Sequence, residues 1–102
     1  MFEAYVLIPV YDNEGTIFSA EDHHQFECLL AERFDGFSLV PSSLTGAWVN
    51  GGKTYHDELR AYVVALRSIA QGGAVVEVAQ AAKAHYRQEA IYIRYLGVSE
   101  VI

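Results

Sequence analysis

Hydrophobic residues recur at every second position in three parts of the chain, which is the spacing of a β-strand that buries one face. These three parts are residues 2–11, 55–67 and 90–96. Pro9 weakens the first pattern near its end, because proline has no N–H to give to a neighbouring strand. A fourth segment, 37–49, is apolar with small and β-branched residues, and we interpret it as a strand broken at Pro41.

Two further segments place hydrophobic residues three or four positions apart, as amphipathic helices do. We predict a helix over about 20–34, because Ser19 is a preferred N-cap residue and Asp22 completes an approximate capping box. A second helix is predicted over 74–87, where many alanines favour helix and permit close packing on a sheet. Leu30 lies in the middle of the first apolar stripe and is predicted to be buried.

The elements therefore follow the order β-α-β-β-α-β, and Asn50-Gly51-Gly52 indicates a hairpin between the second and third strands. Two right-handed crossovers then place both helices on one face of a four-stranded antiparallel sheet. The 102 residues fit one domain. We predict a single α+β domain over residues 1–102, a ferredoxin-like sandwich.

The third strand has one face of small apolar side chains and one face of larger side chains. We expect the small face, which includes Ala61, Val63 and Ala65, to meet the helices, and we predict that Val63 is buried. The opposite face of the sheet would then be open. The residues predicted for this open face are Tyr5, Tyr11, Trp48, Glu58, Arg60, Tyr62, Tyr92 and Arg94.

The composition narrows the possible partners. Lys and Arg total 7 against 13 Asp and Glu, so the formal net charge is −6. Nucleic acid and anionic membranes are bound mainly by neutralising phosphates, so neither is a predicted partner. No apolar run reaches the length of a membrane span and no basic leader precedes the first strand, which favours a cytoplasmic location. The single cysteine excludes an intramolecular disulfide.

An open face with this many aromatic residues is too apolar to remain uncovered on a stable monomer. The favoured hypothesis is a homo-oligomer in which two copies stack their sheets around a twofold axis, with Tyr62 near the centre. One alternative is a ligand pocket between the sheet and its partner. Another is a monomer in which residues 41–56 fold over the sheet. Recognition of RNA by aromatic stacking requires basic surroundings, which the sequence lacks.

Candidate chemistry gathers around the hairpin. His56 and Glu58, close to Trp48, are the residue types of an acid–base pair, because burial in apolar surroundings shifts pKa values toward neutrality. The structural alternative is a solvated turn, in which Trp48 is packed and Glu58 pairs with Arg60 or Arg94.

Other polar residues admit a structural and a chemical interpretation. Gln88 either satisfies backbone groups after the second helix or lines a cleft with Glu89 at the end of the sheet. His24 and Cys28 are four positions apart and share a helix face, but two ligands do not make a zinc site, so no metal is predicted. Cys28 is expected to be a free, exposed thiol, and His23 a packed or capping residue.

Several short motifs together resemble a family of short bacterial domains with no assigned function. These motifs are Phe34-Asp35-Gly36-Phe37, Thr45-Gly46-Ala47-Trp48, Gly52 and Glu58 with the strand that follows, and Tyr86-Arg87-Gln88-Glu89-Ala90. The resemblance covers nearly the whole chain and implies the ferredoxin-like fold, but no reaction. Such domains usually carry an N-terminal leader, whereas this sequence enters an alternating segment directly after Met1.

The sequence contains no phosphate loop, dinucleotide fingerprint or nucleophile elbow, so no cofactor is predicted. The favoured function is a noncatalytic, self-associating module that binds a protein or a small molecule. The alternative is a small cofactor-free enzyme of the dimeric α/β-barrel type, in which His56 or Glu58 acts as acid or base. Its apolar pocket would be lined by Tyr5, Trp48, Tyr62 and Tyr92.

Overall fold

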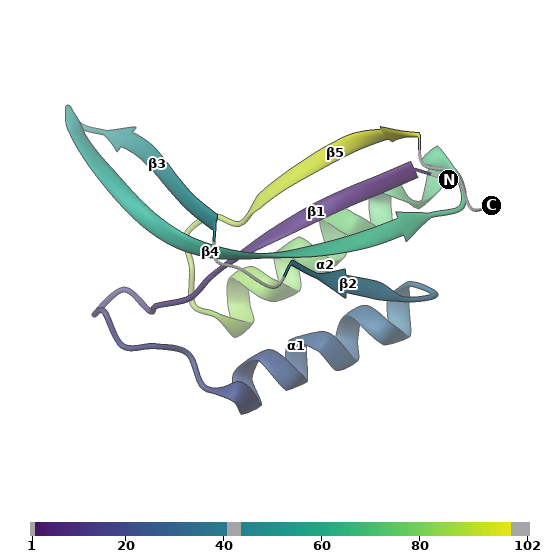
Figure 1. Ribbon diagram of the computed structural model, residues 1–102, viewed down its shortest axis with the longest axis horizontal. Helices are drawn as coiled ribbons and strands as arrows, with labels where there is room; N and C mark the ends of the chain where they lie inside the picture. The colour runs from purple at the N-terminus through teal and green to yellow at the C-terminus, as the bar shows by residue number, and fades with distance from the viewer. Residues whose placement is uncertain (1, 41–43, 99–102) are drawn as a thin grey trace.

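The computed structural model describes residues 2–40 and 44–98 and shows one antiparallel sheet with two α-helices against it (Figure 1). The elements in chain order are β1 (Phe2–Pro9), α1 (Ala20–Arg33), β2 (Phe37–Leu39), β3 (Leu44–Asn50), β4 (Lys53–Leu66), a short 3-10 turn (Ile69–Gln71), α2 (Gly72–His85) and β5 (Tyr92–Val98). Both helices lie on the same side of the sheet (Figure 1). The predicted ferredoxin-like α+β arrangement is confirmed.

The strand order is β2-β4-β1-β5, and β3 pairs with β4 as well. β1 therefore lies between β4, which corresponds to the predicted third strand, and the last strand, β5. This is the arrangement that the predicted topology requires. The sequence predicted four strands, whereas the described residues form five, because the expected strand over 37–49 is divided into β2 and β3. Both pieces pair with β4, β2 at Tyr62–Val64 and β3 at Lys53–Leu59. The break expected at Pro41 lies outside the described residues.

α1 begins where its sequence signals predict. The Ser19 Oγ accepts a hydrogen bond of 3.1 Å from the backbone N–H of Asp22, and the Asp22 carboxylate accepts one from the Ser19 N–H. This capping box satisfies N–H groups that the first turn leaves without partners, and it holds the pKa of Asp22 below its usual range. At the other end, Arg33 pairs with Glu77 of α2 and ties the two helices together.

The core lies between the helices and one face of β1 and β4. Its largest fully buried members from the helix layer are Phe26, Leu30 and Tyr86. Leu30 is buried as predicted. From the sheet the core takes Ala4, Val6, Ile8, Tyr62, Val64 and Leu66.

The predicted orientation of the third strand is wrong. In the β1–β4 register Tyr62 lies opposite Val6, and both belong to the core against the helices. Tyr62 is fully buried, and Arg60, two positions earlier, points to the same side. Val63 therefore faces the open side and is only partly buried. The reason is size: the Tyr62 ring fills the space between the rings of Phe26 and Phe37, which the small alanine face would leave empty.

Candidate functional site: the open face, the hairpin and the hollow beside them

The face of the sheet away from the helices carries a continuous apolar strip. In the register of β1 with its neighbours, Tyr5 lies between Val63 and Arg94, and Leu7 lies between Ala61 and Tyr92. Residues opposite one another in antiparallel strands share a face, so these side chains point away from the helices. Tyr92 is 60 % exposed. The predicted open-face positions of Tyr5, Tyr92 and Arg94 are thus confirmed. Those of Glu58, Arg60 and Tyr62 are wrong, because alternation along β4 turns these three side chains to the side of the helices.

The hairpin of β3 and the first half of β4 extends beyond the body of the protein, rising on the side away from the helices (Figure 1). Its turn has Gly51 at φ 61° and Gly52 at φ 76°, the left-handed values that a two-residue hairpin turn of type I′ requires. The hairpin predicted from Asn50-Gly51-Gly52 is confirmed. At its base, Leu59 lies over Gly46, where an added Cβ would come within 3.2 Å of the leucine Cδ1.

A two-stranded ribbon has little core of its own and is marginally stable in water unless something packs against it. In this hairpin Val49 is 69 % exposed, and His56 and Glu58 are exposed as well. Trp48 lies in β3, opposite Tyr55 of β4, and its side chain is outside the part of the chain that the structure describes. The hairpin therefore presents apolar and polar side chains of both strands to solvent.

A hollow of about 440 Å³ lies between the loop after β1 and the start of β4. From the loop it is lined by Tyr11, Asp12 and Asn13, and from β4 by His56, Asp57 and Glu58. The structure thus brings the two predicted acid–base residues into one hollow. Both are exposed, so the surrounding described residues do not provide the apolar enclosure that the acid–base hypothesis requires. The hollow is lined by three carboxylate side chains, those of Asp12, Asp57 and Glu58, and it is open to solvent.

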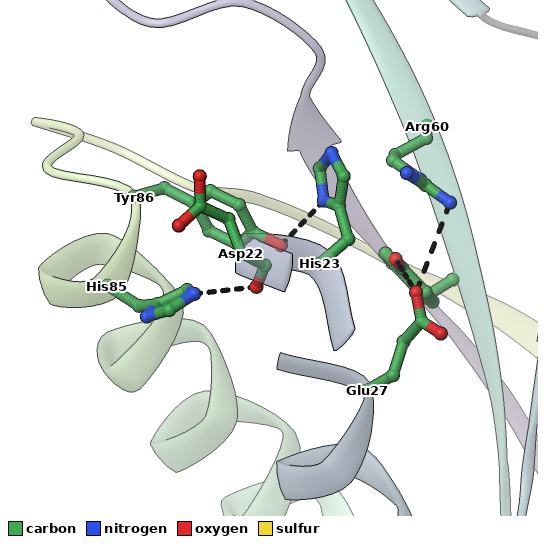
Figure 2. A network of polar contacts seen from close by, with 7 residues as sticks. Asp22, His23, Glu27, Arg60, His85 and Tyr86 are labelled. Atoms are coloured by element: carbon green, nitrogen blue, oxygen red, sulfur yellow. Dashed lines mark hydrogen bonds and ion pairs between the residues drawn. The ribbon is translucent and has the colours of Figure 1, made fainter. Parts of the chain in front are cut away.

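Arg60 and Tyr62 belong to a polar cluster on the helix side of the sheet. Figure 2 shows Arg60 of this cluster opposite Glu27 of α1. The Tyr62 hydroxyl donates a hydrogen bond of 2.7 Å to Glu27 Oε2, and an Arg60 guanidinium nitrogen lies 4.0 Å from the same oxygen. The guanidinium carbon lies 5.4 Å from the centre of the Tyr62 ring. Burial raises the pKa of Tyr62 far above its usual value, and the bond to Glu27 raises it further. These contacts fasten α1 to β4.

The same cluster continues to the end of α2 (Figure 2). His23 Nδ1 lies 2.8 Å from the Tyr86 hydroxyl, and His85 Nε2 lies 2.7 Å from the backbone carbonyl oxygen of Asp22. Burial lowers the pKa of His23, and the nearby Arg60 charge lowers it further. The packed state of His23 was predicted from its place beside the apolar stripe. Its partner was not, because nothing in the sequence links His23 to Tyr86.

Gln88 and Cys28 are two further residues that the sequence analysis singled out. Gln88 Nε2 donates a hydrogen bond of 2.9 Å to the Tyr86 carbonyl oxygen, which confirms that Gln88 satisfies backbone groups after α2. Cys28 is exposed, as predicted, with its Sγ 3.7 Å from His24 Nε2. Within residues 2–40 and 44–98, no group of three or more His, Cys, Asp or Glu side chains is arranged to hold a metal ion. Within the same residues, no helix is long and apolar enough to cross a membrane.

No family model and no curated protein matches this chain. Solved structures do match. A phage SAM lyase in complex with S-methyl-5'-thioadenosine is 13 % identical, with a TM-score of 0.71, and the match covers 94 % of this chain and 80 % of that one. The divalent cation tolerance protein CutA1 from Thermus thermophilus is 16 % identical, with a TM-score of 0.67 over 99 % of this chain and 86 % of that one. CutA1 from Oryza sativa is 14 % identical, with a TM-score of 0.67 over 99 % and 82 %.

The shared feature is the ferredoxin-like fold. Identities this low say nothing about which residues act, and the two kinds of protein carry unrelated descriptions, a lyase and a cation tolerance protein. One fold regularly hosts unrelated functions. The function of this chain must therefore be argued from its own surfaces.

Proposed function

We propose that this protein is a noncatalytic module that associates with further copies of itself through the open face of its sheet and its protruding hairpin. In the same proposal the hollow beside the hairpin holds a small molecule or a segment of a partner protein. Neither nucleic acid nor a membrane is a partner in this proposal, because the net charge is −6 and phosphate recognition depends on basic side chains.

The observation that carries the proposal is the apolar strip on the sheet face away from the helices, where Tyr92 is 60 % exposed, Tyr5 and Val63 are partly buried and Leu7 is buried beside them. Tyr5, Leu7, Val63 and Tyr92 adjoin one another by register, and both helices lie on the other side. A large aromatic side chain buries roughly 150–250 Å² when it is fully covered. A partner on this face would cover most of the Tyr92 ring and the part of Tyr5 that is still exposed. A second copy supplies a surface of matching chemistry without any further protein.

The hairpin supports the same conclusion independently. Its two strands extend past the body of the sheet and expose Val49. A neighbouring copy that packs against the hairpin would stabilise it, and the curved sheet offers the concave side for that contact (Figure 1). The hollow lies beside this hairpin, where His56 and Glu58 line it.

The enzyme alternative loses its predicted pocket. Tyr5 and Tyr92 point to the open side of the sheet, whereas Tyr62 lies under α1 on the other side. These tyrosines therefore cannot line one cavity together. His56 and Glu58 do meet in one hollow, but both are exposed. Among the described residues no observation favours catalysis over binding.

Association is tested by light scattering across a dilution series of wild type, Tyr92→Asp and Val76→Asp. Tyr92 is exposed on the open face, and Val76 is exposed on α2, in the helix layer. We expect an oligomeric wild type, a weakened Tyr92→Asp variant and an unaffected Val76→Asp variant, because only the first substitution places a charge in the contact. A wild type that stays monomeric throughout, or two variants that weaken alike, would contradict the proposal.

The proposal that the protein is noncatalytic has a separate test. Purified protein is incubated with S-adenosylmethionine, and the mixture is analysed by liquid chromatography, with the phage lyase as the active control. We expect no consumption of the compound. Turnover that is lost in a His56→Ala or a Glu58→Gln variant would replace the module with the enzyme alternative.

A further inference from the structure

His23 is a buried histidine at the point where α1, the sheet and the end of α2 meet (Figure 2). Its side chain lies in the first turn of α1 and is only 6 % exposed. The Tyr86 hydroxyl is 2.8 Å from Nδ1, and the Phe18 ring stands edge-on to the Tyr86 ring, with centroids 4.9 Å apart. Phe18 immediately precedes the N-cap Ser19. The imidazole is therefore part of the packing that fixes how the chain enters α1.

Charged groups face this imidazole from every element packed around it. Arg60 of β4 and His85 of α2 oppose a positive charge on the ring, and Asp22 and Glu27 of α1 favour one. The Glu27 carboxylate accepts a hydrogen bond from the Tyr62 hydroxyl and lies near the Arg60 guanidinium. Both contacts reduce how strongly Glu27 attracts a proton to His23. Tyr62 and Tyr86 stay neutral, because burial raises the pKa of both. The effects of burial and of Arg60 outweigh those of the carboxylates, so the pKa of the packed His23 ring is lowered and its neutral form is favoured.

The hydrogen bond to Tyr86 gives a second, geometric reason why the packed His23 ring favours its neutral form. A neutral ring can accept the Tyr86 hydroxyl proton at Nδ1, but a doubly protonated ring can only donate there. In the tautomer whose Nδ1 accepts this bond, protonation requires the buried hydroxyl to turn round so that its oxygen becomes the acceptor. The described contacts of Tyr86 include ring packing on three sides, from Phe18, Phe26 and His85, and this packing restricts such a rearrangement.

The loop that leads into this turn also forms one wall of the hollow. Asp12 and Asn13 line the hollow, and the Asn13 side chain donates a hydrogen bond of 3.3 Å to the carbonyl oxygen of Arg87, just after α2. Phe18 is the buried anchor of this loop, and it packs on Tyr86 beside His23. A change at the His23–Tyr86 contact is therefore transmitted to the wall of the hollow through Phe18.

We propose that protonation of His23 releases residues 12–18 and the first turn of α1 from Tyr86, and so widens the hollow, while the sheet and the rest of α1 stay folded. This is a pH-sensitive latch, by which we mean the reversible contact of His23 and Phe18 with Tyr86. A proton from solvent binds the His23 ring, and the charged ring leaves its buried site. Residues 12–18 then lose the packing that holds them against Tyr86. Only the consequence for binding in the hollow rests on the proposed function. The release itself does not.

The direction with pH follows from the two states. The released ring has the ordinary histidine pKa of about 6.5, and the docked ring has a lower one. Above pH 6.5 both states are neutral and the latch is closed. As the pH falls below 6.5 the released state gains its proton first, so release rises about tenfold for each unit that separates the two pKa values.

The test is NMR on the intact wild-type chain at pH 7.5 and 5.0, with hydrogen exchange corrected for the intrinsic effect of pH. We expect the His23 imidazole to titrate below the ordinary histidine value of about 6.5. We also expect the amides of residues 12–24 to lose protection at the lower pH, while those of β1 and β4 keep theirs. A His23 ring that titrates at or above the ordinary value of about 6.5, or protection that falls evenly across the chain, would overturn the proposal.

Two variants sharpen the result. In His23→Gln the ring is replaced by a neutral amide that can still meet the Tyr86 hydroxyl, so the acid-dependent loss of protection should disappear. His24→Gln, next in the chain but exposed, should keep it. If His23→Gln does not fold, the titration and exchange of the wild type decide the question alone. Retention of the full acid response in a folded His23→Gln would also overturn the proposal.

Discussion

The Tyr62 hydroxyl donates a 2.7 Å hydrogen bond to Glu27 Oε2, and this bond joins the middle of the sheet to α1. It also explains how a tyrosine can lie fully buried in the core: its ring fills space among Phe26 and Phe37, and its hydroxyl is satisfied by a carboxylate. Among the described residues no buried side-chain nitrogen or oxygen is left without a partner.

Tyr62→Phe should therefore destabilise the protein although it keeps the ring. We expect a loss of about 1–2 kcal/mol, near the lower end for hydrogen bonds to charged groups, because Glu27 keeps contact with solvent. Urea denaturation measures it. Tyr92→Phe is the matched control, because Tyr92 is exposed, and it should be neutral. Equal effects of the two substitutions would mean that the bond to Glu27 contributes nothing.

High pH should destabilise the fold through the same residue. Burial raises the pKa of Tyr62 and of Tyr86, so the native state holds both phenols neutral where an unfolded chain ionises them. The stability they contribute is complete below about pH 10, the ordinary tyrosine value, and falls as the pH rises above it. Denaturation midpoints from pH 8 upward check this, and the fall should be shallower in Tyr62→Phe. An unchanged slope in that variant would assign the alkaline loss to other groups.

Leu30→Ala should cost about 2–5 kcal/mol, because Leu30 is fully buried between α1 and the sheet and alanine leaves a cavity. Ile17 supplies the matched control: it is 63 % exposed, so Ile17→Ala should change stability by no more than about 0.5 kcal/mol. Both are measured by chemical denaturation. A Leu30→Ala loss as small as that of the control would mean that the site collapses around the smaller side chain.

Local signals in the sequence predicted the elements well, and the reasons are local too. The capping box of Ser19 and Asp22 and the glycine turn at Gly51 each depend on residues within four positions of one another. The side of the sheet that Tyr62 faces could not be predicted in this way. Residues 61–66 are apolar throughout, so alternation does not distinguish their two faces, and only the register with β1 does.

The candidate site also contains parts that the sequence predicts and parts that it does not. Tyr5 and Tyr92 were placed correctly on the open face, because in their strands they alternate with the aliphatic residues Ala4, Val6 and Ile93 that face the helices. The contact of His23 with Tyr86 joins residues 63 positions apart, and that of Tyr62 with Glu27 joins residues 35 apart. Such pairs follow from how α1 docks on the sheet. A single sequence carries no signal of that docking beyond the apolar stripe itself.

Cys28 should react as a free thiol. It lies exposed on α1, with His24 as its neighbour on the same face. We expect stoichiometric labelling of the folded protein at a rate close to that of the urea-unfolded chain, because exposure, not unfolding, controls access. A colorimetric thiol assay measures both rates, and Cys28→Ser gives the background. Labelling that requires unfolding, or one zinc ion retained after dialysis, would contradict a free thiol.

Gly51→Ala tests the hairpin. Gly51 has φ 61°, a left-handed conformation that costs a residue with a Cβ about 1–2 kcal/mol. The control is Gly73→Ala in α2, where nothing lies within 4 Å of an added Cβ and alanine favours helix. We expect Gly51→Ala to speed amide exchange in β3 and the first half of β4 without affecting β1.

Light scattering should then show weaker association of Gly51→Ala, because the hairpin is part of the proposed contact. Gly73→Ala should match wild type in both measurements. A variant with a loosened hairpin but unchanged association would confine the contact to the sheet face around Tyr92.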